Sequence, residues 1–370
     1  MRDTIKTPKR LNKIRIANFI SVKGFASKNE IASVLNLSMP TTLQNVKELM
    51  EAGYIVETGE YESTGGRKAK ALAVAENLGY AVGMDITAHH INFVLVNMRR
   101  KIERWKRIRL VFEDTDAYYE QMGQELHQFI REAEDMENPV IGVGISVPGI
   151  VNQEKVLLQS HALGASNISF QDMDSRIGYP YRLENDANCA AYAELVEQDC
   201  DTVYLSLSST VGGAIYLHDS LYPGEHFRSG EFGHMVIEAN GRVCYCGKKG
   251  CVDAYCSAKV LQRRTDDNLE LFFQKVREGD PDCMQAWEEY MEYLAIAVTN
   301  LRMAFDCRIV LGGYVGGYLE EFLPELSRKI KKHNLFDLDT AYVRTGKYKL
   351  EASAYGAALP FVKNYFEENM

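Results

Sequence analysis

A long hydrophobic run is missing from this sequence, and its absence argues against a membrane-spanning protein. The longest weakly polar stretch, Val140 to Val151, covers twelve residues and is interrupted by Gly and Pro, whereas a membrane helix needs about 20 apolar residues. The basic start, Met1 to Arg10, has no apolar segment behind it and so lacks the pattern of a secretory signal. We therefore expect a cytoplasmic protein that has no membrane partner.

Disulfide bonds are not expected either. The chain has eight cysteines, but thiols stay reduced in the cytoplasm. Its residues are 46% hydrophobic, 25% charged and 10% aromatic, a composition that excludes disordered, collagen-like and coiled-coil proteins. Because single cores usually stop growing at about 250–300 residues, a chain of 370 residues is expected to form more than one domain.

Basic residues are outnumbered over most of the chain but not at its start. Residues 1–75 contain 12 Lys and Arg against 7 Asp and Glu, a net charge of +5, whereas the remainder contains 30 against 44, a net charge of −14. This asymmetry is expected when only one end of a protein meets a polyanion. A solvated basic tail is the alternative.

The basic block also carries the pattern of a helix-turn-helix. Ser27 begins a capping box before one short helix, and Ser38 caps the next helix. Two short helices joined by about four residues are typical of this motif. The segments 54–57 and 69–74 are expected to pair as strands around a wing, which completes a winged helix-turn-helix domain over residues 1–75.

The outer face of the third helix is the expected DNA-binding surface. We predict that Leu43, Val46 and Leu49 face inward and that polar side chains face outward, where they can reach base edges or phosphates. The predicted DNA contacts are Thr41, Thr42, Gln44, Asn45 and Lys47 on this helix and Arg67 and Lys68 in the wing. A three-helix protein-interaction module is the alternative.

The rest of the chain alternates strand and helix patterns, which predicts an α/β fold. Helical patterns cover 122–133 and 258–305, and another begins at Tyr318. The expected strands lie at 80–86, 91–95, 108–112, 140–147, 203–207, 214–217, 235–237 and 308–311. Periodicity alone gives the α/β class but not the order of the strands.

Clustered cysteines provide the strongest chemical signal. Cys244, Cys246 and Cys251 lie within eight residues that also contain two turn-forming glycines, and His234 lies ten residues before the first of them. Three thiolates and one imidazole satisfy a closed tetrahedral Zn2+ site, which is structural rather than catalytic. We predict one Zn2+ per chain; reduced packing cysteines are the alternative.

Four motifs resemble the ROK family, which is named for repressors, open reading frames and kinases. They are Gly144-x-Ser146-x-Pro148-Gly149, Leu-Glu-Asn-Asp-Ala-Asn at 183–188, Gly-Glu-Phe-Gly-His-Met at 230–235, and the cysteine motif at 244–251. The resemblance covers about residues 78–370. It implies an actin-like (ribonuclease-H-like) two-lobed sugar-kinase fold preceded by the winged helix-turn-helix domain, with residues 77–186 plus the C-terminal helix to 370 as lobe 1 and 187–345 as lobe 2.

The same resemblance implies a sugar site between the lobes. By family position its contacts are Asn167, Asn185, Asp186, Glu231, His234 and Asp253. Asp186 stands where kinase members have their general base. The family pattern has Glu where this chain has Asp253, and the shorter side chain predicts a changed hydrogen bond or a different sugar epimer. Surface or capping roles for these polar residues are the alternative.

The glycine-rich loops that hold ATP in kinase members are not kept. The family's first loop reads Asp-x-Gly-Gly-Thr, whereas residues 87–89 are Thr-Ala-His, and residues 208–210 are Ser-Ser-Thr where kinases have Gly-Thr-Gly. Cβ atoms at these positions would crowd the phosphates. We therefore expect no catalysis, although Asp186 is kept.

These features predict a sugar-responsive DNA-binding transcriptional regulator, most simply a repressor of carbohydrate metabolism genes. Its partners would be double-stranded operator DNA and a small sugar or sugar-phosphate effector, and the family implies a homodimer or a dimer of dimers. Two other hypotheses remain: an ATP-dependent ROK kinase of a hexose or N-acetylhexosamine with an N-terminal regulatory domain, and a sensor that acts through a protein partner.

Overall fold

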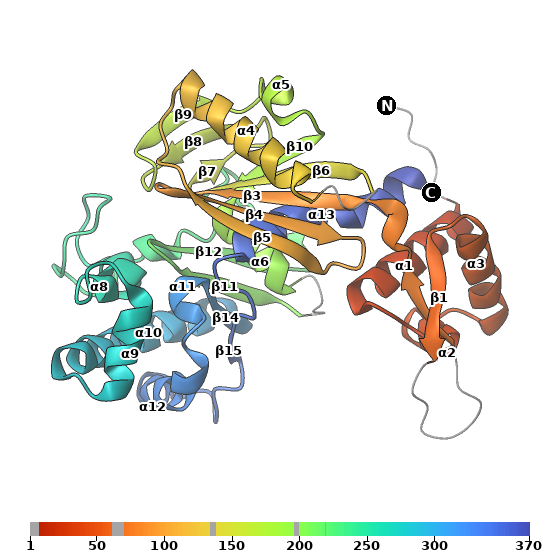
Figure 1. The fold of residues 1–370 in the computed structure, drawn as a ribbon. Coiled ribbons are helices and arrows are strands. Elements are labelled where there is room, and N and C mark those ends of the chain that lie inside the picture. The colour runs from red at the N-terminus through yellow and green to blue at the C-terminus, as the bar shows by residue number, and fades with distance from the viewer. Residues whose placement is uncertain (1–6, 61–69, 134–137, 196–199, 219) are drawn as a thin grey trace.

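Three helices and a two-stranded antiparallel sheet form an N-terminal module, at the right of Figure 1. The computed structural model describes residues 7–60, 70–133, 138–195, 200–218 and 220–370. Side-chain oxygens of Thr7, Ser27 and Ser38 accept hydrogen bonds from backbone N–H groups three residues ahead, so each helix begins at a cap. The elements are α1 (Pro8–Lys23), α2 (Lys28–Val34), α3 (Met39–Glu51), β1 (Ile55–Glu60) and β2 (Lys70–Val74).

A five-stranded mixed sheet, in the order β10-β6-β3-β4-β5, is the centre of what we call the first lobe. Helix α4 packs on one face of this sheet and α13 on the other. A small antiparallel sheet and the short helix α5 complete the lobe. The elements are β3 (Tyr80–Ile86), β4 (His90–Asn97), β5 (Ile102–Arg109), α4 (Asp116–Arg131), β6 (Val140–Val147), β7 (Ile150–Val151), β8 (Val156–Ser160), β9 (Ala165–Ser169), α5 (Asp174–Ile177), β10 (Tyr181–Asn185) and α13 (Ala352–Asn369).

A second five-stranded sheet, in the order β13-β12-β11-β14-β15, is the centre of the second lobe. Helix α6 packs on one face, and the long helix α10 packs with α7 to α9 and α12 on the other. The elements are α6 (Asp186–Leu195), β11 (Thr202–Leu207), β12 (Val211–Leu217), β13 (Ser220–Leu221), α7 (Asp253–Cys256), α8 (Ala258–Gln262), α9 (Leu269–Glu278), α10 (Pro281–Phe305), β14 (Arg308–Gly312), α11 (Gly313–Gly316), α12 (Leu323–His333) and β15 (Val343–Thr345), with 3-10 turns at Glu76–Leu78, Phe232–His234 and Glu320–Phe322.

Helices α6 and α13 lie between the two sheets and pack closely against each other. A Cβ atom added to Gly356 of α13 would lie 1.7 Å from the backbone oxygen of Cys189 in α6, so only glycine permits this approach. Strand β10 leads directly into α6 at Asp186. The junction of the lobes is therefore built from the end of one strand and two helices in contact.

Two of the expected strands differ in the structure. The strand expected at 235–237 is absent; a 3-10 turn occupies 232–234, and only an isolated bridge joins Val236 to Cys251. The strand expected at 108–112 begins earlier and ends at Arg109. In the segment 235–237, Met235 and Ile237 pack against the core of the second lobe, while Val236 is exposed.

No helix among the described residues is long and apolar enough to cross a membrane.

Candidate functional site

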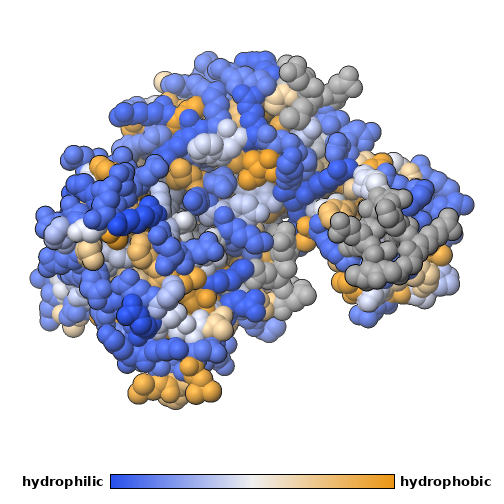
Figure 2. All heavy atoms as spheres, turned by 60° about the horizontal axis from the view of Figure 1, so that its bottom comes forward, coloured by the Kyte–Doolittle hydropathy of each residue, from blue (hydrophilic) through white to orange (hydrophobic). Residues whose placement is uncertain are grey.

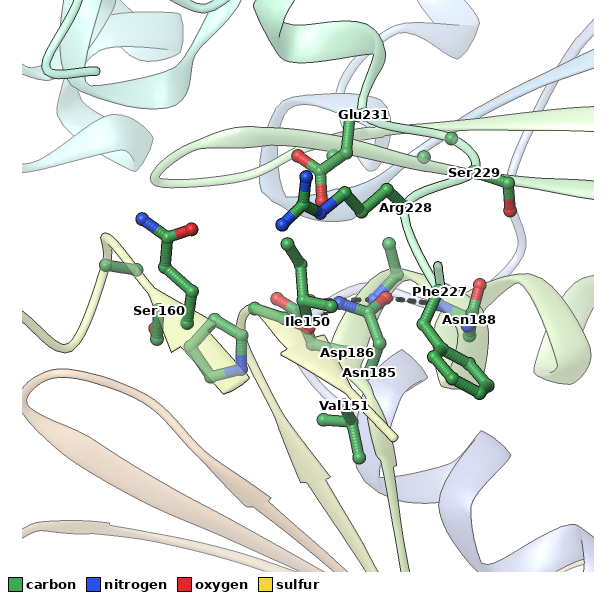
Figure 3. Close-up of a pocket in the computed structure, with 18 of the residues that line it drawn as sticks. Ile150, Val151, Ser160, Asn185, Asp186, Asn188, Phe227, Arg228, Ser229 and Glu231 are labelled. Carbon is green, nitrogen blue, oxygen red and sulfur yellow. Dashed lines mark hydrogen bonds between the residues drawn. The ribbon is translucent and has the colours of Figure 1, made fainter. Parts of the chain in front are cut away.

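A pocket of about 900 Å³ opens where β10 passes into α6. Residues 148–162 of the first lobe form one wall, and residues 223–234 and 245–248 of the second lobe form the other. Figure 3 shows Arg228 and Glu231 extending from the second-lobe wall toward the side on which Asn185 and Asp186 lie. Polar groups from both lobes therefore converge on one space, which is the arrangement that a polyhydroxyl ligand requires.

Asn185 and Asp186 are held in place by a network of hydrogen bonds. Asn185 Nδ2 donates to the backbone oxygen of Gly149 at 2.8 Å and to Asp186 Oδ1 at 3.1 Å. The same Oδ1 accepts from the backbone N–H of Ala187 at 2.9 Å, and Asn188 N donates to Asn185 Oδ1 at 2.9 Å. Both side chains are fixed before a ligand binds, because the strand end and the first turn of α6 supply their partners.

The carboxyl group of Asp186 is strongly perturbed. Burial, together with the neighbouring carboxyl groups of Asp85 and Glu231, raises its pKa to about 7. Asp85 accepts hydrogen bonds from Ser146 Oγ at 2.7 Å and Asn92 Nδ2 at 2.9 Å, and burial raises its pKa as well. Near neutral pH Asp186 can therefore either donate or accept a hydrogen bond.

The predicted metal ligands come together. The ligand atoms of His234, Cys244, Cys246 and Cys251 all lie within 4.8 Å of one another. Sγ atoms of Cys246 and Cys251 are 3.8 Å apart, and His234 Nδ1 is 3.9 Å from Cys244 Sγ. Zinc–sulfur bonds of about 2.3 Å in a tetrahedron place two sulfurs about 3.8 Å apart. This group can hold a metal ion.

His234 also belongs to the pocket wall. Its Nδ1 faces the cysteines, while its Nε2 lies 3.3 Å from the Tyr245 hydroxyl and 3.9 Å from Glu231 Oε2. The rings of His161 and Tyr245 pack against its ring, with centroids at 6.1 Å and 5.4 Å. One imidazole thus connects the metal-binding group to the pocket through its two nitrogens.

Two predicted sugar contacts are not among the lining residues. Asn167 lies exposed on β9, with a φ of 58°. Asp253 is buried at 5% exposure, and its Oδ1 accepts a hydrogen bond from Val211 N at 2.6 Å. Burial raises the pKa of Asp253 to about 6. The shorter carboxylate therefore holds the start of β12, which lines the pocket, instead of reaching the pocket itself.

The exposed face of α3 differs from the predicted one. Thr42 and Asn45, predicted to face DNA, are buried at 0% and 2% exposure. Their side chains donate to the helix's own carbonyls, Thr42 Oγ1 to Ser38 O at 3.1 Å and Asn45 Nδ2 to Thr41 O at 2.7 Å. Leu43, predicted to face inward, is 46% exposed.

The outward stripe of α3 therefore contains apolar as well as polar residues. Gln44 and Lys47 are exposed as predicted, and Thr41 is half-buried beside Ser38. Arg67 and Lys68 lie outside the described residues. The exposed residues of α3 are Met39, Pro40, Leu43, Gln44, Lys47 and Glu51, and Lys47 Nζ lies 3.7 Å from Glu51 Oε1.

Several pocket residues were missed by the sequence analysis. Asn188 lies one helical turn after Asn185 in the same motif, and Arg228 lies two residues before another motif, so their neighbourhood was a usable signal. His161 gave no signal, because nothing in its local sequence places it beside His234.

Comparisons with known proteins agree with this geometry. The ROK family matches residues 81–363, and a winged helix-turn-helix DNA-binding family matches residues 10–56. The xylose repressor of Bacillus subtilis is 27% identical over 300 residues, 77% of each chain.

Among solved structures, a ROK family transcriptional regulator described as a homologue of the E. coli MLC protein aligns over 97% of this chain and 96% of its own, with a TM-score of 0.73 and 21% identity. A ROK family glucokinase from Streptomyces griseus, solved with glucose and AMPPNP, aligns over 76% of this chain and 99% of its own, with a TM-score of 0.64 and 23% identity. These likenesses show the fold. Because the family match covers most of the length of this chain, the chain belongs to the ROK family.

Proposed function

We propose that this chain is a transcriptional repressor whose affinity for operator DNA responds to a small sugar bound between its lobes. One observation carries the proposal: the N-terminal module and the first lobe share a hydrophobic core through α13. Because the DNA-binding motif shares its core with the sugar-kinase fold, a ligand bound to that fold can change DNA binding through packing contacts. The similarity to the Bacillus subtilis xylose repressor supports the same conclusion.

The contacts of α13 give this route. Its N-terminal half touches the pocket, because Ser353 Oγ donates to the backbone oxygen of Asp186 at 3.1 Å. Its C-terminal half belongs to the module: Phe366 packs edge-on against Tyr54, and Tyr54 Oη donates to Asn369 O at 2.6 Å. A ligand that displaces the start of α6 therefore shifts a helix whose other end carries the module. The ligand must prefer one of the two positions to change DNA affinity.

Sugar recognition is assigned to the fixed polar groups of the pocket. Asn185, Asp186, Glu231 and His234 line it, and Arg228 adds a donor from the second lobe. Leaving one buried hydroxyl mispaired costs about 1–3 kcal/mol, so this set can distinguish between sugars. Asn167 and Asp253 act from outside the wall, Asp253 by holding β12 in place.

The metal-binding group is proposed to hold one Zn2+ through His234, Cys244, Cys246 and Cys251. Burial raises the pKa of Cys244 to about 12, so a cation is needed to keep this thiol ionised at neutral pH. The bound ion would fix the loop that contributes Tyr245 and Lys248 to the pocket. Its role is structural, because four protein ligands leave no open position.

An ATP-dependent kinase is the rival function, and the turn between β3 and β4 argues against it. The turn between β3 and β4 is closed on itself, since Thr87 N donates to His90 O at 2.9 Å and Thr87 Oγ1 accepts from His90 N at 3.1 Å. The retained glycines have packing roles: a Cβ at Gly312 would lie 2.2 Å from the Tyr204 hydroxyl oxygen, and Gly313 has a φ of 77°. We therefore propose a sensor that binds sugar without phosphorylating it.

The test uses full-length protein and DNA duplexes selected from a random library. We expect selected duplexes to bind in preference to random DNA, and at least one pentose, hexose or N-acetylhexosamine to change that affinity about tenfold or more. Asp186→Ala should keep DNA binding and lose the sugar response. Sugar phosphorylation from ATP and Mg2+ that disappears in Asp186→Ala would contradict the proposal, and so would the absence of any selected sequence.

The assembly is proposed to be a homodimer or a dimer of dimers, so that two modules contact two half-sites. Light scattering of the full-length protein tests this directly.

A further inference from the structure

We propose that α3 recognises adenine–thymine base pairs, with Leu43 against a thymine methyl group and Gln44 on a neighbouring adenine. This inference rests on the proposed DNA-binding function and adds to it the kind of base pair that each half-site must contain.

The exposed residues at the N-terminal end of α3 are apolar. This is the end that meets the bases in a recognition helix. Met39 and Leu43 are 38% and 46% exposed, and Pro40 lies between them on the same side. These residues occupy the first turn and a half of the helix, the part that enters the groove in helix-turn-helix proteins. Most of the surface in Figure 2 is hydrophilic, and two exposed apolar side chains one turn apart on this helix give a partner apolar surface to bury.

Only one chemical group in the major groove offers such a partner. The C5-methyl group of thymine is apolar, whereas G·C pairs present only donors and acceptors there. A leucine that enters the groove gains burial against thymine and leaves polar edges unsatisfied against G·C. Leu43 therefore favours T·A pairs by both effects.

Gln44 is oriented by a neighbour on the next turn. Its Nε2 donates to Glu48 Oε1 at 2.6 Å. Glu48 is held in turn by ion pairs with Lys9 and Lys13 of α1, each at 2.5 Å. One N–H and the amide oxygen of Gln44 stay available, which is the set that pairs with N7 and N6 of adenine. The two lysines also offset the charge of Glu48, which would otherwise repel phosphates.

The charge of the N-terminal module favours DNA over an apolar protein as the partner that binds this face of α3. Residues 1–75 carry a net charge of +5 on a chain whose total is −9. Ser38 caps the helix at the same end as the apolar stripe, so backbone N–H groups there favour an anion. A polyanion that also carries apolar groups fits this face, and duplex DNA with thymine is such a ligand.

The experiment compares wild type with Leu43→Ala and Gln44→Ala, each full length. Leu338→Ala is the control, because Leu338 is 99% exposed on the segment after α12 in the second lobe. Each protein selects duplexes from a random library, and the wild-type site is then remade with deoxyuridine in place of each thymine in turn. Deoxyuridine removes only the methyl group. A second series replaces each adenine by 7-deazaadenine, which removes N7.

We expect uracil at one position of each half-site to weaken wild-type binding about three- to fivefold, and to have no further effect on Leu43→Ala. 7-Deazaadenine should weaken the wild type but not Gln44→Ala, and Leu338→Ala should behave as wild type throughout. The proposal is overturned if the positions at which Leu43→Ala loses its sequence preference are G·C in the sites selected by wild type. It is also overturned if wild type binds every uracil duplex as tightly as its thymine parent. If wild type selects no sequence at all, the proposed DNA-binding function fails first, which is a distinguishable result.

Discussion

Among single residues, Asp186 links three features of the fold. It follows the last residue of β10, begins α6, and lies near two other acidic groups, Asp85 and Glu231. Its pKa of about 7 lies above the value of about 3.9 for an unfolded aspartate. Between these two values the native protein keeps a proton that the unfolded chain releases, so the free energy of unfolding falls as pH rises through this window.

Asp186→Asn should remove that part of the pH dependence. We expect the variant to match wild type near pH 4 and to be more stable by about 1–2 kcal/mol at pH 8, where the wild-type carboxylate is charged and buried. Urea unfolding at both pH values measures the difference. Asp172→Asn, at an exposed position, is the control and should show no such gain. An unchanged pH profile in Asp186→Asn would mean that Asp186 ionises normally.

Cys246 supports a second prediction. Cys246→Ser should reduce bound zinc from about one per chain to near zero, because a hydroxyl is a poor replacement for a thiolate ligand. Metal analysis after dialysis gives the result, and thermal unfolding should shift downward with it. Cys200→Ser changes a cysteine outside the cluster and should keep its metal. Wild-type protein that is folded and free of metal would contradict the prediction.

The grouping of the cysteines was predictable from sequence because turn glycines keep all three within one loop. The burial of Thr42 and Asn45 was not, since each side chain donates to the carbonyl four residues earlier and so keeps a donor paired inside the protein. Sequence periodicity assigns such residues to the solvent face. Leu43 was misplaced for the converse reason, because its periodic position predicts burial but its side chain is 46% exposed.

Among helices and strands, the contact between α6 and α13 is the least tolerant of change. Gly356→Ala should push the helices apart, because its new Cβ would meet the backbone oxygen of Cys189. We expect a loss of about 1–3 kcal/mol in the free energy of unfolding and a weaker response of DNA affinity to sugar. Denaturant unfolding and DNA titrations with sugar test both. Lys363→Ala, at an exposed position on the same helix, should change neither.

Strands with continuous apolar patterns, such as β3, β6 and β11, were predictable to within about a residue because each is buried on both faces. The segment 235–237 has the same local pattern but does not form a strand. Its backbone pairs with the cysteine loop, since Ile237 N and Val252 N bond to Gly250 O and Met235 O. A backbone contact set by the cysteine loop leaves no periodic signal.

Across the full chain, the N-terminal module depends on residues about 300 positions away. Phe366→Ala should destabilise the module by about 3–5 kcal/mol, because Phe366 is buried in the core that it shares with α1 and α3. DNA binding should be lost while sugar binding survives, as measured by DNA titration and calorimetry. Phe336→Ala removes an equal side chain that is 86% exposed and should leave both intact. Equal loss of sugar binding in Phe366→Ala would show that the module and the lobes unfold together.

This dependence was outside the reach of sequence reasoning. The motif at 1–75 has its own caps, strands and charge, and nothing in it records that Ile16, Ile20 and Leu72 share one hydrophobic cluster with Val362 and Phe366. Long-range packing of this kind has no local signature.

The shared core also has a genetic consequence. A nonsense or frameshift mutation at a codon just before Val362 would leave every codon of the DNA-binding motif intact and still remove Val362 and Phe366 from its core. Such an allele should have the phenotype of a deletion within the motif itself. A peptide fused directly after Met370 would be held beside the motif, because Tyr54 is hydrogen-bonded to the backbone of Asn369. The residues from Val362 onward are therefore as necessary to the DNA-binding motif as the motif's own residues.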